Sequence, residues 1–170
     1  MTTKKRKIVS SRHLATEGGW PLSEVEFGLT VVYNAFQKWI VRCAAAAGQP
    51  DLNAIDVLVL HNVNHRDNAK RRIDISFLLN IEDAHTVNYA LKKLVNLELV
   101  EKQKRGKEIF YSTSAKGKKL CEEYRNVREQ CLIPGMRQID QDADELSRHA
   151  ETLRTLSGLY DQASRAAASL

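Results

Sequence analysis

The chain has 170 residues, of which 28% are charged and 6% are aromatic, and its formal net charge is +5. This length fits one domain with helical extensions, and the composition is typical of a helix-rich globular protein. The apolar runs are too short to span a membrane, and the N-terminus lacks the apolar core of a signal peptide. We therefore expect a cytoplasmic protein that makes no membrane contact.

The first segment, residues 1–19, is polar and carries five Lys or Arg residues within positions 1–12. It has no helical periodicity, so we expect a flexible basic arm. Residues 20–50 follow as a long helix. Pro21 suits its first turn and Ser23 suits a cap, while Gly48-Gln49-Pro50 should end the helix. Its apolar residues recur mostly at three- and four-residue steps and predict one apolar face, made of Phe27, Val31, Val32, Ala35, Trp39 and Ala46.

Residues 51–117 carry shorter elements. Asn53 suits the cap of a second helix, and the polar residues 65–72 predict a loop. Residues 73–75 are compatible with a short strand. Residues 76–80 predict a short helix with Phe77 and either Leu78 or Leu79 pointing inward.

A third helix of this region begins at Glu82 or Asp83 and runs to about Asn96. Residues 99–103 and 108–113 alternate as strands do, and Arg105-Gly106 supplies the turn of a hairpin.

Residues 118–170 predict further helices. Ser114 caps the first of them, and Pro134-Gly135 interrupts the helical pattern. The pattern resumes over residues 136–159, and residues 163–170 look frayed. The expected fold is therefore mainly α with a small β-hairpin, a winged helix-turn-helix between flanking helices.

In a helix-turn-helix the second helix enters the major groove of DNA, with its N-terminal residues at the base edges. Here Val87, Leu91 and Leu94 keep a helical step and should face the core. The outer face then holds side chains that can bond base edges or phosphates. These candidates are His85, Thr86 and Asn88 for bases, and Tyr89 and Lys92 for phosphates. The alternative is an ordinary amphipathic helix with a solvated polar face.

The hairpin would be the wing. Nine Lys or Arg residues against three Asp or Glu residues lie in positions 92–119, and such an excess suits a polyanion. Arg105 at the predicted tip could enter a minor groove, with Lys104 and Lys107 beside phosphates. The alternative is a hairpin whose charge only keeps the protein soluble.

These segments resemble the MarR family of transcription regulators over most of residues 21–160. The resemblance implies a homodimer that binds double-stranded DNA, with a small-molecule effector as a further partner. The wing departs from the family, because Lys104-Arg105-Gly106-Lys107-Glu108 replaces an Asp-x-Arg motif and Glu98 replaces a glycine. A divergent branch or another winged-helix family, such as PadR, is also compatible. The matching segments are residues 75–79, 85–94, 99–100 and 112–117.

Residues 20–50 and 118–170 would be the dimerisation helices, because one small domain cannot easily cover their apolar residues. A twofold dimer would place two reading helices about one DNA turn apart, on a pseudo-palindromic operator. The alternative is an intramolecular helical cap. The residues proposed for the interface are Trp20, Phe27, Trp39, Leu146, Leu153, Leu156 and Leu159.

Other chemistry has weaker support. His61 and His65 are four residues apart but lack a third ligand, so we expect no metal site and no cofactor. Cys43, Cys121 and Cys131 form no CxxC pair; buried, inert thiols are favoured over an oxidation switch. The acidic residues at 140–145 suit a solvated helical face, and no enzyme motif is present. The second function we consider is a winged-helix module that binds an acidic protein partner.

Overall fold

The structure is a computed structural model that describes residues 11–139 and 142–170. The chain forms two compact units, residues 1–129 and residues 130–170. Residues 1–10 of the predicted basic arm lie outside the described residues. In the rest of the arm, Arg12–Leu14 form one turn of 3-10 helix.

The long first helix, α1, spans Trp20–Ala46, with Pro21 in its first turn as predicted. The chain then leaves the helix through Gly48, whose φ of 98° favours glycine. The predicted apolar face is only partly correct. Trp39 packs against the core. Val31 and Val32 are exposed, and the buried apolar residues of α1 are Ile40, Cys43 and Ala44.

The next helix, α2, spans Ala54–Asn64 and has Asn53 as its cap, as predicted. A 3-10 turn, His65–Asp67, and a two-residue strand, β1, Lys70–Arg71, follow it. Helix α3 spans Arg72–Leu78. The strand predicted at 73–75 is wrong, because Asp74 accepts the backbone N–H of Arg71 at 3.2 Å and so starts the helix earlier.

Because α3 begins earlier, its inward residues differ from the prediction. Ile75 is buried, and Leu79, just beyond the helix, packs against the core. Phe77, expected to point inward, is 83% exposed. Leu78 is exposed as well.

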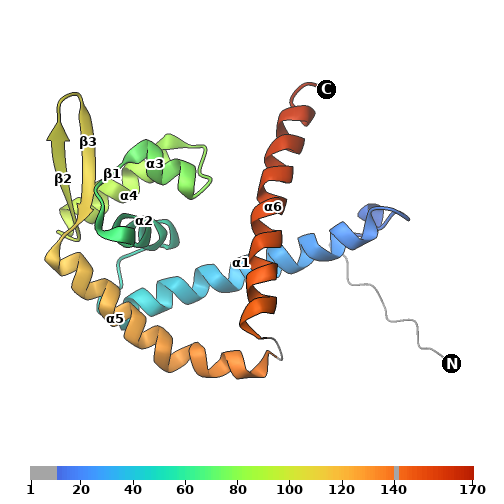
Figure 1. Ribbon diagram of the computed structural model, residues 1–170, viewed down its shortest axis with the longest axis horizontal. Helices are drawn as coiled ribbons and strands as arrows, with labels where there is room; N and C mark the ends of the chain where they lie inside the picture. The colour runs from blue at the N-terminus through green and yellow to red at the C-terminus, as the bar shows by residue number, and fades with distance from the viewer. Residues whose placement is uncertain (1–10, 140–141) are drawn as a thin grey trace. The chain divides into compact units, whose positions relative to one another are not determined.

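Helix α4 spans Ala84–Asn96 and is the predicted reading helix. The wing follows as strands β2, Val100–Arg105, and β3, Glu108–Thr113, which project from the helices as a hairpin (Figure 1). Strand β1 pairs with the other edge of β3, so the antiparallel sheet has three strands in the order β1-β3-β2.

The hairpin turn lies one residue later than predicted. Arg105 pairs with Glu108 as the last residue of β2, so the tip consists of Gly106 and Lys107. Gly106 has a φ of 61°, as two-residue hairpin turns require.

Helix α5 spans Ala115–Cys131, and the Ser114 hydroxyl accepts the N–H of Gly117 at 3.0 Å. Gly117 is required here, because a Cβ atom at this position would collide with the backbone oxygen of Leu99. Pro134-Gly135 lie in a 3-10 segment, Ile133–Gln138, which confirms the predicted break.

Helix α6 spans Ala143–Ala167. It begins later than predicted, because Asp142 caps it by accepting the N–H of Glu145 at 2.8 Å. It also continues through residues expected to fray. Of the acidic residues noted in the sequence, Asp140 lies outside the described residues, and those placed at the start of α6 stabilise its positive end.

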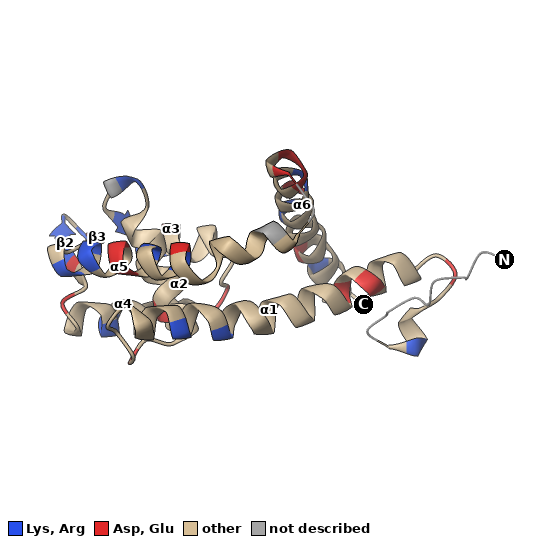
Figure 2. Ribbon diagram, turned by 90° about the horizontal axis from the view of Figure 1, so that it is seen from below, with Lys and Arg blue, Asp and Glu red and all other residues tan. Residues whose placement is uncertain are grey.

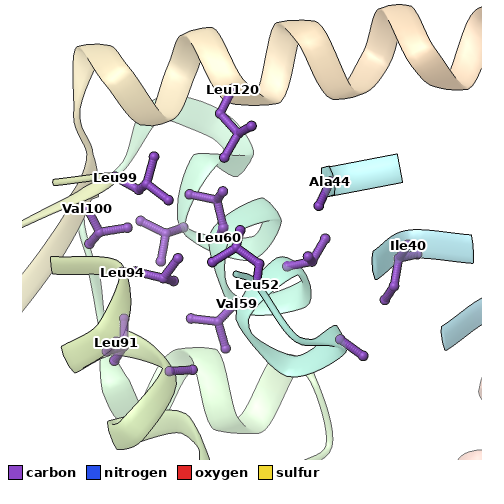
Figure 3. Packing of buried hydrophobic residues seen from close by; sticks show 14 of the residues in the cluster. Ile40, Ala44, Leu52, Val59, Leu60, Leu91, Leu94, Leu99, Val100 and Leu120 are labelled. Atoms are coloured by element: carbon purple, nitrogen blue, oxygen red, sulfur yellow. The ribbon is translucent and has the colours of Figure 1, made fainter. Parts of the chain in front are cut away.

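The core of the first unit joins α1, α2, α4, the start of β2 and α5. Figure 3 shows Leu60 from α2 between Leu94 of α4 and Ala44 of α1. Val87, Leu91 and Leu94 are all buried, which confirms the predicted inner face of the reading helix. Burial of this face leaves the opposite side of α4 free to meet a ligand.

A buried ion pair fixes α4 against α2. Asp56 is 2% exposed; its carboxylate accepts the Asn53 N–H at 2.9 Å and the Lys93 ammonium at 2.7 Å. Lys93 also donates to the backbone oxygen of Asp51. A buried carboxylate needs such partners, since its desolvation is otherwise uncompensated. The pair therefore sets the position of α4 relative to the start of α2.

We predict that Lys93→Met destabilises the fold by about 2 kcal/mol, less than a fully buried pair would cost because Lys93 is partly exposed. Denaturant unfolding measures the free energy, and Lys92→Met, at the exposed neighbouring position, is the control. Adding Asp56→Asn to Lys93→Met should recover part of the loss. Equal effects at positions 92 and 93 would contradict this role.

Glu98 occupies a position that favours glycine. Its φ is 60°, just after α4, where the Glu98 N–H donates to Val95 and the Leu99 N–H donates to Leu94. Such a left-handed residue ends many helices and is usually glycine. Glycine adopts this conformation freely, whereas Glu98 adopts it at the cost of a close contact of its Cβ atom.

We predict that Glu98→Gly stabilises the protein by about 1 kcal/mol, because glycine adopts the left-handed conformation without a Cβ penalty. The lost contact with Lys116, 3.8 Å long and exposed, contributes little. Glu101→Gly, in an extended strand, is the matched control and should destabilise. Denaturant unfolding measures the free energy of both variants. If Glu98→Gly were less stable than the parent protein, the prediction would be wrong.

Candidate nucleic-acid interface

The start of α4 is organised by Asp83. Its carboxylate accepts the backbone N–H of His85 at 2.9 Å and the hydroxyl of Thr86 at 2.8 Å. These bonds lower the pKa of Asp83, the largest effect coming from the His85 N–H. The cap therefore leaves the His85 ring exposed, while the Thr86 hydroxyl is already engaged by Asp83.

The other predicted residues of α4 lie along the same outer face. Tyr89 and Lys92 are exposed and Asn88 is half-buried. The Lys92 ammonium lies 5.8 Å from the centre of the Tyr89 ring, within the range of a cation–π contact. The face thus offers an imidazole, an amide, a phenol and an ammonium group over about two turns, while Lys93 is turned toward α2.

The wing has two different faces. Lys102 and Lys104 stand opposite Tyr111 and Ile109 in the ladder, so these four side chains share one face. Gln103 and Arg105 share the other face with Phe110 and Glu108.

Arg105 is held on that second face rather than at the tip. Its guanidinium lies 4.8 Å from the centre of the Phe110 ring, and its Nε donates to the Gln103 side chain at 3.0 Å. Lys107 occupies the tip and is exposed, and Lys104 is exposed on the first face. Figure 2 shows Lys and Arg residues gathered on the hairpin.

An ion-pair network joins the wing to α3. The guanidinium of Arg71 donates to Glu108 at 2.8 Å and to Asp74 at 2.8 Å. The bond from Arg71 is the main cause that lowers the pKa of Asp74. Because these side chains are partly exposed, the network contributes orientation more than stability.

A hollow of about 200 Å³ lies between α4 and the first face of the wing. It brings together Asn88 and Lys92 of the predicted set. Lys102, on the wing side of this hollow, was not among the predicted residues, although the alternation of β2 places it on the same face as Lys104. The lining residues are Asn88, Leu91, Lys92, Val95, Asn96, Lys102, Ile109 and Tyr111.

Of the other candidate residues, Cys43 is buried as expected, whereas Cys131 is exposed, so the expectation of buried thiols is wrong for Cys131. His61 packs edge-on against Tyr124, with ring centres 4.4 Å apart, and burial lowers its pKa. Within residues 11–139 and 142–170, no cluster of three potential metal ligands occurs. Burial, with a smaller effect of Glu122, raises the pKa of Cys121 to about 11, so this thiol is unreactive at neutral pH. The described helices include none long and apolar enough to cross a membrane.

The comparisons with known proteins agree with this architecture. Residues 52–117 match the sequence model of the winged helix DNA-binding domain. No curated protein sequence matches the chain.

Solved structures resemble most of the chain. A MarR transcriptional regulator from Methanosarcina mazei is 19% identical, with a TM-score of 0.63 over 80% of this chain and 90% of its own. A MarR family regulator from Neisseria meningitidis is 18% identical, with a TM-score of 0.65 over 84% and 95%. A mutant MarR from E. coli complexed with operator DNA is 16% identical, with a TM-score of 0.57 over 76% and 93%. Residues 52–117 therefore match a winged helix domain in sequence, and the chain has the fold of the solved MarR family regulators.

Proposed function

We propose that this protein is a transcription regulator that binds double-stranded DNA sequence-specifically, as a homodimer on a pseudo-palindromic operator. The observation that carries the proposal is the exposed polar face of α4, which stands beside a lysine-rich wing in a winged helix domain. The operator complex of the E. coli protein, which shares the fold, supports it.

From this geometry, we assign base contacts to some of the predicted residues and phosphate contacts to others. Asn88 and His85 would read base edges, since an amide can bond adenine at two atoms. Thr86 would offer its methyl group, because Asp83 accepts its hydroxyl proton. Tyr89 and Lys92 would contact phosphates, which position the protein without reading sequence.

On the wing, Lys104 and Lys107 would contact phosphates as they stand, both being exposed. Arg105 would have to leave Phe110 and Gln103 to reach a minor groove.

We predict that Asn88→Ala relaxes the base preference at one position of each half-site, with a loss of about 1–3 kcal/mol on the preferred sequence. Selection of duplexes from a random pool, followed by binding titrations, measures both effects. Asn126→Ala, an exposed asparagine of α5, is the control and should leave the selected sequence unchanged. An unchanged sequence preference in Asn88→Ala would remove Asn88 from the reading set.

The dimer rests on an exposed apolar stripe of α1. Leu22, Val25, Leu29, Val32 and Phe36 follow steps of three and four residues, the spacing of a helix-helix seam. All but Leu29, which is half-buried, are exposed, with Val32 at 58%. A stripe of this kind favours burial against another helix. In α6, where no residue from Ala143 to Ala167 is buried, Leu153 and Leu159 are also exposed.

We predict that Val32→Asp weakens the dimer by at least tenfold in dissociation constant, because burying an unpaired carboxylate is costly. Asn34→Asp, two residues along on another side of the helix, is the control and should keep the dimer. Sedimentation equilibrium measures the association, and circular dichroism checks the helix content. A parent protein that is monomeric at all concentrations would contradict the proposed dimer.

An effector that alters DNA binding is part of the proposal. A surface hollow of about 620 Å³ in the first unit is lined by Arg66, Lys118 and Arg125, with Asn64, Cys121 and Glu122. Its three cationic side chains favour an organic anion. A thermal-shift screen with organic acids tests this, and binding that persists in Arg125→Gln would place the effector elsewhere.

The second candidate function is a protein-interaction module. The exposed apolar residues of α3, namely Ile73, Phe77 and Leu78, favour it, since such a patch suits a protein partner. Duplex binding separates the two functions. A DNA reader selects a sequence from the random pool, whereas an interaction module selects none.

A further inference from the structure

We infer that the hollow between α4 and the wing holds one phosphate of the DNA strand, and that the side chains of Lys102 and Lys92 both bind this phosphate. The inference rests on the proposed function and adds to it a wing lysine outside the predicted set. It assigns the first face of the wing, rather than Arg105, as the surface that meets the strand nearest the reading helix.

The chemistry of the lining supports a sugar-phosphate unit. Lys92 comes from α4 and Lys102 from β2, so two different elements each bring one lysine to the lining of the same small space. The remaining lining includes the apolar Leu91, Val95 and Ile109, which suit the carbon face of a deoxyribose. A space of about 200 Å³ equals about seven water volumes, enough for one phosphate and part of its sugar.

Lys92 and Lys102 are the charged residues among those that line the hollow, so an anion there depends on them. Asn96, at the C-terminal end of α4, also lines the hollow, and the negative end of the helix dipole there opposes an anion. Anion binding at this place therefore requires cationic side chains. Asp56 does not engage Lys92, because Lys93 forms that ion pair, and Lys102 stands opposite Tyr111 in the ladder and not opposite a carboxylate.

The geometry also explains why the two faces of the wing differ. The face toward α4 carries Lys102 and Lys104. On the other face, Arg105 stacks on Phe110, and Glu108 binds Arg71. A strand that runs between helix and wing meets the first face, whose lysines have no carboxylate opposite them in the ladder.

The test uses the full-length protein and the duplex that it selects from a random pool. Lys102→Gln should reduce the steepness of the plot of log binding constant against log salt by up to about 1.8, which is about 0.9 for the contact in each half-site of the dimer, and leave the selected sequence unchanged. Lys92→Gln should act likewise. Lys119→Gln, an exposed lysine of α5 with the same charge change, is the control and should keep the slope.

Duplexes with a single neutral methylphosphonate locate the contact. One position should weaken binding of the parent protein and weaken binding of Lys102→Gln less, because that variant has lost one of the two lysines that bind this phosphate. If Lys102→Gln keeps both the parent slope and the parent sensitivity at every position, the inference is wrong while the proposed function stands. If the parent protein selects no duplex, both are wrong.

Discussion

The buried contact between Asp56 and Lys93 is the constraint on which the candidate interface depends. Asp56 closes the first turn of α2 and, through the same carboxylate, binds a lysine from the last turn of α4. One buried charge thus fixes both the start of one helix and the rotation of the next. With Lys93 turned inward, the helical period places His85, Asn88, Tyr89 and Lys92 outward. The polar face of α4 is therefore a consequence of packing as much as of composition.

The turn that follows α4 is likewise fixed by a few contacts. Glu98 turns the chain in a left-handed conformation, and Gly117 lets α5 approach the backbone of Leu99. The Ser114 hydroxyl joins the two, since it donates to the oxygen of Glu98 at 2.6 Å and accepts the N–H of Gly117. The base of the wing is thereby held at one point by backbone geometry. The wing can be short and still keep its place beside α4.

Much of this fold was predictable from the sequence, because its signals are local. Pro21, Asn53, Ser114 and Pro134 mark element boundaries that the structure confirms, and the period of Val87, Leu91 and Leu94 identifies the inner face of α4. The errors arose where the outcome is decided by a long-range partner, or by a local cap that the composition does not reveal.

Three cases show this limit. Residues 73–75 have a strand-like composition, but the bonds of Asp74 to Arg71 start a helix there. The spacing of α1 identifies apolar residues, but which of them are buried depends on α2 and α5, whose positions the spacing does not encode. Lys93 looks like its neighbour Lys92 in the sequence, yet only the tertiary contact with Asp56 separates their roles.

The wing shows why counting positive charges is a weak guide to a binding site. Arg105 and Lys102 carry the same charge and lie three residues apart, so strand alternation places them on opposite faces. The guanidinium of Arg105 lies over the ring of Phe110 and donates to the Gln103 side chain. Lys102, in contrast, lines the hollow against α4. The two faces of a basic hairpin are therefore not equivalent, because only one of them lies toward α4. For a strand of DNA that lies along α4, position on that face decides which lysines act as ligands, and the total charge of the hairpin governs only the longer-range attraction.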